Sequence, residues 1–333
     1  MRTFVIAEVG SVHDGSFGNA LRLVDAAAQC GVDAVKFQTH IASAETLPAA
    51  PNPPYFDGEE RAAYFERTAF SLEQWSRIKS HCEERGVLFL SSPFSEEAVD
   101  LLERIGLLRY KIPSGEVTNL PLLEKIAQLD KPILLSSGMS TWEELDRAVA
   151  AIRRHHSQLT LLQCTSEYPC PYERVGLNVM LGMKDRYGLP VGLSDHTLTS
   201  YASLAAVALG ASVVERHMTF SRKMYGSDAQ HSMELPEMTD LVSGIRAIEE
   251  MRDTVVDKSD ISHLQNMKKV FEKSIVTTVL VPAGAPLTRQ MLASRKPGTG
   301  ISAADIEDVV GRRARRDLPA NTLLEPSDLV ESE

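Results

Sequence analysis

Short apolar runs recur through about the first 250 residues, and most of them end in polar or charged side chains. Two of these runs, Gly192–Thr197 and Val213–Phe220, turn polar at a histidine, and a helical pattern from Thr199 to Leu209 separates them. An apolar run of this kind predicts a buried parallel strand whose C-terminal end opens into a site. The two runs and the helical pattern therefore predict a β-α-β unit.

The same unit repeats along the chain. We predict strands at residues 4–10, 34–38, 87–90, 108–112, 132–135, 159–164, 192–197 and 213–217. Eight strand-helix units in about 250 residues are typical of a (β/α)8 TIM barrel, an α/β fold in which function lies at the C-terminal ends of the strands. A doubly wound open sheet is the alternative, but no Gly-x-Gly-x-x-Gly motif follows the first strand.

Two local signals refine this prediction. Residues 40–70, rich in proline, alanine and aromatic side chains, are expected to form a long loop over one end of the barrel. Helices are expected to begin at capping boxes, one formed by Ser71 with Gln74 and one by Ser140 with Glu143.

The alternation of strands and helices stops near residue 256, and shorter β patterns take over from residue 274. We therefore divide the chain into a barrel domain at 1–256, a polar linker at 257–273 and a small β-rich domain at 274–333. Short strands are expected in the last part at 274–280, 287–288 and 323–324. About 60 residues make a domain that is marginal by itself, so we expect it to dock on another surface.

Composition narrows the class of partner. The chain has 333 residues and a formal net charge of −10, which argues against nucleic acid or an anionic membrane as the main partner. No apolar stretch approaches the roughly 20 residues of a membrane helix, and the four cysteines show no C-x-x-C spacing. We expect a cytoplasmic protein with reduced thiols. An anionic substrate would then need cations that are local and focused.

Such cations occur at the predicted strand ends. Lys36 and Lys111 lie there, and a lysine in a strand that is buried on both faces requires a paired charge or a bound anion. Hydroxyl groups are predicted at the same end of the barrel, at Ser92, Ser114, Ser136 and Ser194. Together these groups suit a phosphate and a carboxylate. Lysines on solvated strand ends and serines that cap helices are the simpler alternatives.

Two histidines at neighbouring strand ends, His196 and His217, are candidate ligands of one divalent metal. Two protein ligands would leave coordination positions open for water and substrate, and the ion would act as a Lewis acid. Glu8, near the mouth of the barrel, is a candidate to position or deprotonate a water. Histidines satisfied within the core, and an ion pair between Glu8 and a barrel lysine, are the alternatives.

Several of these residues lie in motifs that resemble the sialic acid synthase family. The motifs are Ala7–Gly10, Val35–Gln38, Tyr110–Glu116, Ser136–Met139, Ser194–Thr197 and Glu215–His217. The segment Lys296–Ile301 resembles the antifreeze-like (SAF) domain that follows the barrel in that family. The resemblance covers nearly the whole chain, and the ordered set of motifs is far more specific than any one of them.

The resemblance implies a condensation of phosphoenolpyruvate with the open-chain aldehyde of an N-acylmannosamine-type sugar. The products would be a nine-carbon α-keto acid and phosphate, and N-acetylneuraminate synthase is the activity it favours. Alternative acceptors are N-acetylmannosamine 6-phosphate and the diamino sugars that lead to legionaminic or pseudaminic acid. A protein of a different class, a non-catalytic sugar-binding protein of a polysaccharide system, is the remaining alternative.

The resemblance also implies roles for individual residues. His196 and His217 would bind Mn²⁺ or Mg²⁺, which polarises the aldehyde for attack by C3 of phosphoenolpyruvate, and Glu8 would handle the water that adds to C2. Phosphoenolpyruvate would be held by Lys36, Ser92, Lys111, Ser114, Ser136 and Ser194. The sugar would be contacted by Gln38, Glu116, Tyr168, Asp228 and Lys296. The small domain would reach the barrel of a partner subunit in a domain-swapped homodimer.

The chain departs from the family pattern at a few positions, all of which bear on the sugar or the loops. The usual Asn-His-Asn-Gly is here Val12–Gly15, and Ser92 and Ser166 stand where threonine and asparagine are common. Lys296, preceded by Arg295, replaces an expected arginine, and the two residue types are not interchangeable where a planar fork is needed. A phosphorylated sugar would need extra cations at the rim, for which Arg222, Lys223 and Arg295 are candidates.

Overall fold

The computed structural model describes residues 2–47, 49–52 and 59–330 of the chain. The chain divides into two compact units, Met1–Thr254 and Val255–Glu333. None of the helices in the described ranges has the length and apolar character that a bilayer crossing requires.

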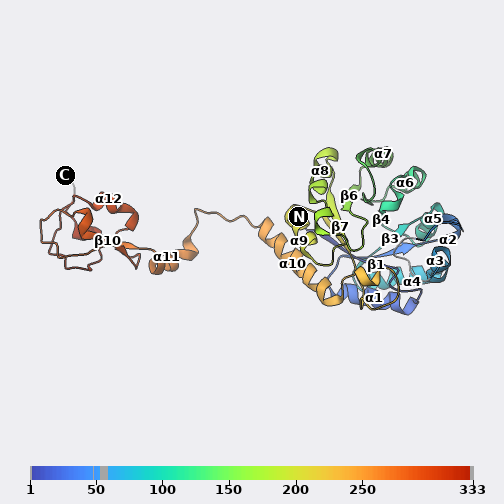
Figure 1. The fold of residues 1–333 in the computed structure, drawn as a ribbon, viewed down its shortest axis with the longest axis horizontal. Coiled ribbons are helices and arrows are strands. Elements are labelled where there is room, and N and C mark those ends of the chain that lie inside the picture. The colour runs from blue at the N-terminus through green and yellow to red at the C-terminus, as the bar shows by residue number, and fades with distance from the viewer. Residues whose placement is uncertain (1, 48, 53–58, 331–333) are drawn as a thin grey trace. The chain divides into compact units, whose positions relative to one another are not determined.

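The first unit is a closed barrel of parallel strands, in which each strand pairs with the next along the chain (Figure 1). In the described residues these strands are β1 Phe4–Gly10, β2 Ala34–Thr39, β3 Leu88–Pro93, β4 Tyr110–Ile112, β5 Ile133–Ser136, β6 Leu159–Cys164, β7 Val191–Asp195 and β8 Val213–His217. β1 pairs with both β2 and β8, which closes the barrel. The predicted (β/α)8 TIM barrel is confirmed, and the open sheet is wrong.

Helices cover the outside of the barrel (Figure 1). They are α1 Phe17–Gln29, α2 Ala42–Glu45, α3 Arg61–Thr68, α4 Leu72–Glu84, α5 Glu96–Arg104, α6 Leu120–Ala127, α7 Trp142–Arg153, α8 Leu177–Tyr187, α9 Tyr201–Ala208 and α10 Leu235–Asp253. Ser71 and Gln74 form the predicted capping box of α4. The second box lies one residue later than predicted, because Thr141 and Glu144 make both of its hydrogen bonds.

The predicted loop at 40–70 is wrong in part, since α2 and α3 lie within it. The structure describes 40–47, 49–52 and 59–70 of this segment. The buried residues of α3 are Tyr64, Phe65 and Thr68. Two of the aromatic side chains in this segment, Tyr64 and Phe65, therefore lie on the packed face of a helix.

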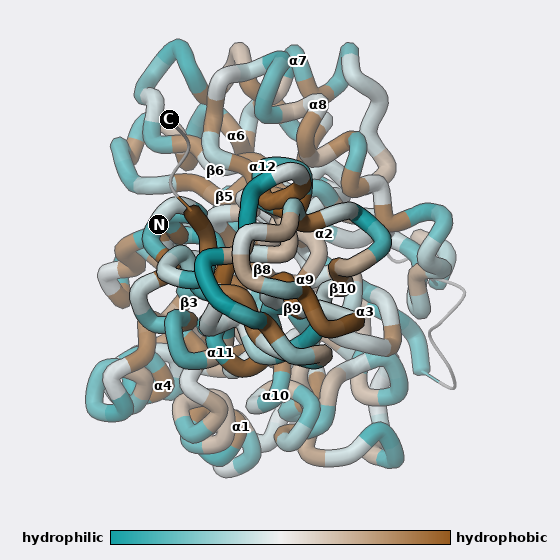
Figure 2. The backbone as a smooth tube through the Cα atoms, turned by 90° about the vertical axis from the view of Figure 1, so that its left-hand side faces the viewer, coloured by the Kyte–Doolittle hydropathy of each residue, from teal (hydrophilic) through white to brown (hydrophobic). Residues whose placement is uncertain are grey.

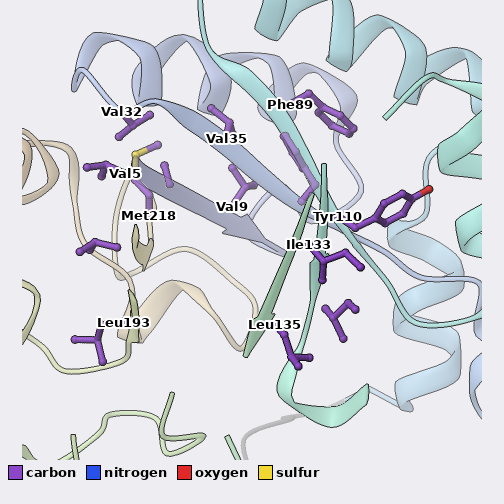
Figure 3. Packing of buried hydrophobic residues seen from close by; sticks show 14 of the residues in the cluster. Val5, Val9, Val32, Val35, Phe89, Tyr110, Ile133, Leu135, Leu193 and Met218 are labelled. Carbon is purple, nitrogen blue, oxygen red and sulfur yellow. The ribbon is translucent and has the colours of Figure 1, made fainter. Parts of the chain in front are cut away.

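Side chains alternate between the inside and the outside of the barrel along each strand. On β1, Val5 and Ala7 belong to the apolar layer between strands and helices, part of which Figure 3 shows. Figure 2 colours the backbone by the hydropathy of each residue, and hydrophobic residues are concentrated on strands such as β5 and β6.

A separate apolar cluster lies inside the barrel and includes Ile6, Ala34, Leu90, Leu134, Leu162 and Val213. Two positions further along each of these strands lie Glu8, Lys36, Ser92, Ser136, Cys164 and Glu215. The period of two thus turns these six residues to the same side as the inner cluster.

The second unit contains a two-stranded antiparallel sheet of β9 Ser274–Thr277 and β10 Leu292–Arg295. Its helices in the described range are α11 Gln265–Phe271, which lies in the predicted linker, and α12 Ile306–Val309. The strand expected at 287–288 does not form within the residues described, and the one at 323–324 is reduced to a single bridge between Leu323 and Val276. The unit has its own apolar core, which includes Ile275, Val281 and Leu318.

A buried ion pair joins β7 to β8 just before the predicted metal ligand His196. Arg216 and Asp195 are register partners, lie 2.5 Å apart, and are at most 2% exposed in their side chains. The Arg216 guanidinium also donates to the carbonyl oxygens of Thr197 and Thr199, while Asp195 accepts from the Thr197 amide. The pair therefore fixes the backbone on both sides of His196.

We expect Arg216→Met to lower the free energy of unfolding by about 3–5 kcal/mol, because it leaves the Asp195 carboxylate buried without its cation. Urea denaturation followed by circular dichroism measures this loss. The matched control is Arg174→Met, which removes an exposed pair with Glu167 and should change stability little. The double variant Asp195→Asn/Arg216→Met should recover part of the loss. Equal stability of Arg216→Met and wild type would contradict the assigned role.

Candidate active site

Two buried lysines meet two buried carboxylates inside the barrel. Lys36 Nζ lies 2.7 Å from Glu8 Oε2 and 3.5 Å from Glu215 Oε1, and Lys111 Nζ lies 2.9 Å from the same Glu215 oxygen. The four side chains are at most 5% exposed. The register brings Glu8 opposite Lys36 across β1 and β2. The two predicted lysines therefore share one carboxylate, and their placement on solvated strand ends is wrong.

These contacts determine the charges in the barrel. Burial lowers the pKa of Lys36, but Glu215 and Glu8 outweigh it, and the pKa is raised. Burial lowers the pKa of Lys111, and the ammonium of Lys36 lowers it further, while Glu215 opposes both. Burial raises the pKa of Glu215, but the two lysines prevail and bring it down to about 2. The cluster holds two ammonium groups against two carboxylates, so its formal charges cancel.

Glu215 is the residue that sequence reasoning missed. It lies within one of the motifs quoted for the family resemblance, yet it was assigned no role. The available signal was the alternation of Val213, Glu215 and His217, which places the carboxylate on the inner face of β8 between an apolar residue and a candidate metal ligand.

The predicted serines lie around this cluster in different ways. Ser92 accepts a hydrogen bond from Lys36 Nζ at 3.3 Å, and Ser194 donates to Glu215 at 3.1 Å. Ser114, in the short 3₁₀ helix Ser114–Glu116, accepts from the Gly138 amide at 3.1 Å. The hydroxyl of Ser136 is buried without a hydrogen-bond partner among the residues that the structure describes. A buried hydroxyl without a partner is a group that a ligand can satisfy.

Glu8 is held by two neighbours from β2. Besides its ion pair with Lys36, it accepts a hydrogen bond from Gln38 Nε2 on Oε1 at 2.8 Å. Lys36 and Gln38 lie two positions apart, so both point toward the inside of the barrel, as the sequence predicted. The ion pair between Glu8 and a barrel lysine, the alternative considered for this residue, is present and fixes the orientation of the carboxylate.

The two predicted metal ligands lie close together at the ends of β7 and β8. The imidazole centroids of His196 and His217 are 5.6 Å apart, and Tyr168 packs on His196 at a centroid distance of 4.2 Å. The Nδ1 atom of His196 is 2.8 Å from the Thr165 carbonyl oxygen, a contact in which Nδ1 carries a hydrogen and donates. Nδ1 of His217 is buried and, within the described ranges, has no hydrogen-bond partner.

These features fit a divalent metal held by two protein ligands. Burial lowers the pKa of His217, and the nearby carboxylates of Asp228 and Glu8 offset only part of this effect. The ring is therefore neutral at pH 7, and neutral imidazole is the form that coordinates metal. No group of three or more histidine, cysteine or acidic side chains with metal-binding geometry occurs in the part of the chain that is described. Water and substrate would therefore have to supply the remaining ligands.

Cys164 is a second residue near the site without a predicted role. It is a free, buried cysteine at the end of β6 and is opposite Ser194 in the sheet register. Burial raises the pKa of its thiol, but His196, Ser114 and Lys111 outweigh burial and the pKa is lowered. For His196 burial lowers the pKa, and the neighbouring Cys164 raises it by more. The thiol is thus part of the polar surroundings of the candidate metal ligand.

Asp228 approaches the end of β1 because position 10 has no side chain. Its Oδ2 accepts hydrogen bonds from both the amide and the hydroxyl of Ser11 at 2.8 Å. Gly10 has a φ of 55°, and a Cβ atom there would lie 2.3 Å from Asp228 Oδ2. Burial raises the pKa of Asp228, while His217 and the Ser11 bonds lower it by more. Asp228 is therefore an ionised group beside His217.

The remaining residues predicted to contact the sugar are spread more widely. Glu116 accepts from Asn119 at 2.8 Å, and burial raises the pKa of its carboxyl. Tyr168 lies over His196, as described above. Lys296 belongs to the second unit, where its ammonium lies 4.8 Å from the centre of the Phe271 ring. The first unit by itself thus gathers Gln38, Tyr168 and Asp228 around the histidines, and Lys296 is not among its residues.

A cavity of about 640 Å³ opens beside the ends of β5 and β6. Its lining combines apolar residues of α7 and α8 with the polar segment that follows β6, including Cys164, Ser166 and Glu167. This volume falls within the range of small-molecule sites. Position 166, where the family resemblance leads us to expect asparagine, therefore faces open space near the candidate metal ligands.

Comparison with models of known protein families identifies the family of this chain. The model of the NeuB family matches residues 23–257, and the model of the SAF domain matches residues 272–330. The chain belongs to the NeuB family. It is therefore an enzyme, a synthase of the sialic acid type with a C-terminal SAF domain, and the predicted family resemblance is confirmed.

Individual members of the NeuB family differ in the products that their names state. N,N'-diacetyllegionaminic acid synthase of Campylobacter jejuni is 36% identical over 97% of this chain and 99% of its own length. N-acetylneuraminate-9-phosphate synthase of Homo sapiens is 32% identical over 93% of this chain and 88% of its own length. The sialic acid synthetase structure of Leptospira borgpetersenii matches with a TM-score of 0.71 and 28% identity, over 80% of this chain and 91% of that one. The family is thus fixed, and the acceptor sugar is not.

We expect Glu215→Gln to lower the free energy of unfolding by about 3–5 kcal/mol at neutral pH, because Lys36 and Lys111 keep only Glu8 as a counter-charge. A lowered pKa in the folded state means that the Glu215 carboxylate adds stability above its ordinary value of 4.5, and that this stability is lost as the pH falls toward about 2. The difference between variant and wild type should therefore shrink as the pH falls through this range.

Chemical denaturation at pH 7, 4.5 and 3 measures this dependence. Glu250→Gln, which alters an exposed carboxylate on α10, is the matched control and should show no such difference. A constant gap between Glu215→Gln and wild type over this pH range would show that the carboxylate does not titrate as described.

Proposed function

We propose that this NeuB-family enzyme condenses phosphoenolpyruvate with the open-chain aldehyde of an N-acylmannosamine-type sugar. The products would be a nine-carbon α-keto acid and inorganic phosphate. The observation that carries the proposal is the pair of buried lysines, Lys36 and Lys111, bound to one carboxylate inside the barrel. Fixed ammonium groups in a place that excludes water are suited to a small, strongly anionic substrate.

The serines around the lysines support the same substrate. We assign Lys36, Ser92, Lys111, Ser114, Ser136 and Ser194 to phosphoenolpyruvate. Ser136, whose buried hydroxyl lacks a partner within the described residues, would gain one from a phosphate or carboxylate oxygen. Ser92 and Ser194 already bond the lysine–carboxylate cluster, so they can exchange these bonds for bonds to the ligand as it enters.

The second half of the reaction is assigned to the histidine end of the site. His196 and His217 would hold Mn²⁺ or Mg²⁺, and such an ion supplies Lewis-acid polarisation of a carbonyl oxygen. Glu8 would position and deprotonate the water that adds to C2 of the enol phosphate, so that phosphate leaves by cleavage of the C–O bond. Its bonds to Lys36 and Gln38 favour the ionised carboxylate that this role requires.

The acceptor is proposed to be an unphosphorylated amino sugar, with N-acetylmannosamine as the first candidate. The cations considered for a 6-phosphate are largely engaged: Arg222 pairs with Glu237, and Arg295 donates to Asn321. A diamino sugar is the second candidate, favoured by the likeness to the legionaminic acid synthase and by the cavity beside Ser166. We assign Gln38, Glu116, Tyr168 and Asp228 to the sugar.

We further propose that the active assembly is a domain-swapped homodimer in the cytoplasm. In it, the SAF domain at 274–333 would present Lys296 to the barrel (1–256) of the partner subunit, with 257–273 as the linker. The small size of the SAF domain and the separate apolar core that it contains support a role as a docking module. The four free cysteines suit a reducing compartment.

The test of the function is a panel of acceptors incubated with phosphoenolpyruvate and Mn²⁺, scored by release of phosphate. We expect release only when both an amino sugar and the metal are present, and faster release with N-acetylmannosamine than with its 6-phosphate. In ¹⁸O-water the released phosphate should carry no label, because C–O cleavage places the water oxygen on carbon. No release with any acceptor in the panel would contradict the proposed reaction.

We expect Glu8→Gln to reduce kcat by roughly 10²–10⁴-fold, the usual effect of losing a positioned acid–base group. His217→Ala should abolish turnover and also weaken Mn²⁺ binding, which titration calorimetry measures without any substrate. His81→Ala, which changes a histidine paired with Asp25 between α1 and α4, is the control and should alter neither quantity. Unchanged kcat in Glu8→Gln, or unchanged Mn²⁺ affinity in His217→Ala, would remove the assigned roles.

A further inference from the structure

A histidine without an assigned role lies directly behind the proposed catalytic carboxylate. His40 follows the last residue of β2, and its ring contacts two polar side chains. Its Nε2 lies 3.0 Å from Gln38 Oε1, and its Nδ1 lies 2.8 Å from Glu45 Oε1 at the end of α2. Because Gln38 Nε2 donates to Glu8, a continuous row of hydrogen-bonding contacts runs from Glu45 through His40 and Gln38 to Glu8.

The direction of the two bonds nearest Glu8 follows from the groups that make them. The Glu8 carboxylate, paired with Lys36, accepts, so Gln38 presents its amide nitrogen to Glu8 and its oxygen to His40. An amide oxygen only accepts, so Nε2 of His40 must carry a hydrogen and donate to Gln38. On the other side of the ring, Nδ1 faces Glu45 Oε1.

The surroundings of His40 hold the ring in this orientation. It is stacked between Phe65 and Phe94, with ring centroids 3.7 and 4.1 Å away and interplanar angles of 13° and 20°. Two aromatic rings packed this closely block rotation of the imidazole. The cavity against Gln38 and His40 is only about 10 Å³, roughly the space of one water, so the imidazole has no room to turn into it.

Charges from several elements bear on the ring. Glu45 is its direct partner, and the other oxygen of Glu45, Oε2, is buried with no hydrogen-bond partner in the described part of the chain. His40 also interacts electrostatically with Glu116, Asp228 and His13. Arg61 lies over the Phe65 ring at 5.5 Å. Glu45, Glu116 and Asp228 are thus the acidic groups around the ring, and His13 and Arg61 are the basic groups.

We propose that His40 is a positioning residue, whose Nε2–H group holds the Gln38 amide in the one orientation that donates to Glu8. Without the donor at His40 Nε2, the amide can rotate and present its oxygen to the Glu8 carboxylate, which repels it. Glu8 then loses a bond that orients its carboxylate. This inference rests on the proposed function, because there Glu8 acts on the water.

Kinetics of variants test the positioning role. His40→Leu should reduce kcat roughly 10–100-fold, as loss of an outer-shell partner commonly does, with the KM for phosphoenolpyruvate within about threefold of wild type. His40→Gln, whose amide nitrogen can replace Nε2 as the donor to Gln38, should restore most of the loss. His81→Leu, a histidine with a carboxylate at the same 2.8 Å, is the control. Unchanged kcat in His40→Leu, or a loss of equal size in His40→Gln, overturns the proposal.

Magnetic resonance tests the geometry without any substrate. In the full chain with ¹⁵N-labelled histidine, the ring signals that His40→Gln removes should report a hydrogen on Nε2 at pH 7. A ring with its hydrogen on Nδ1 alone would overturn the proposed donor arrangement, whatever the enzyme catalyses. If wild type shows the hydrogen on Nε2 but releases no phosphate with any acceptor, the function proposed for Glu8 fails and the hydrogen-bonding row stands.

Discussion

The barrel depends on the compensation of charge in its interior. Two ammonium groups enter a space without solvent only because Glu215 lies between them and Glu8 lies beside one of them. This arrangement needs neighbouring strands in a fixed register, with Glu8 opposite both Lys36 and His217. The closed sheet is therefore what allows such a density of charge, and the charges in turn make only one register acceptable.

The balance of charge also explains how such a site can discriminate among ligands. A cluster whose formal charges cancel has little attraction for an anion at long range, and its ammonium groups become available only when an incoming oxygen competes with a carboxylate. A divalent cation between the histidines would make the site more attractive to anions. In the proposed function, the binding of an enol phosphate and of a metal would therefore be linked through electrostatics, although different residues are assigned to each of them.

Much of the site could be predicted from the sequence because the period of two in a strand places side chains without knowledge of their partners. Glu8, Lys36, Ser92 and His217 follow from that rule. What local patterns do not contain are contacts between elements far apart in the chain. Glu215 was missed because its partners lie on β2 and β4. His40 was missed because Glu45 and Phe65 come from a segment that was expected to be a loop, and Phe94 follows the distant strand β3.

The left-handed glycine at the end of β1 restricts how this enzyme can be altered. Asp228 occupies the volume that any side chain at Gly10 would need, so the end of β1 and the segment after β8 must change together. A designer who wishes to alter acceptor preference by exchanging the segment that holds Asp228 has to preserve that close approach. The loops after β4 and β6 are coupled in the same way to the end of β5, because a Cβ atom at Gly138 would lie 2.6 Å from Ser114 Oγ and 2.5 Å from Ser166 Oγ.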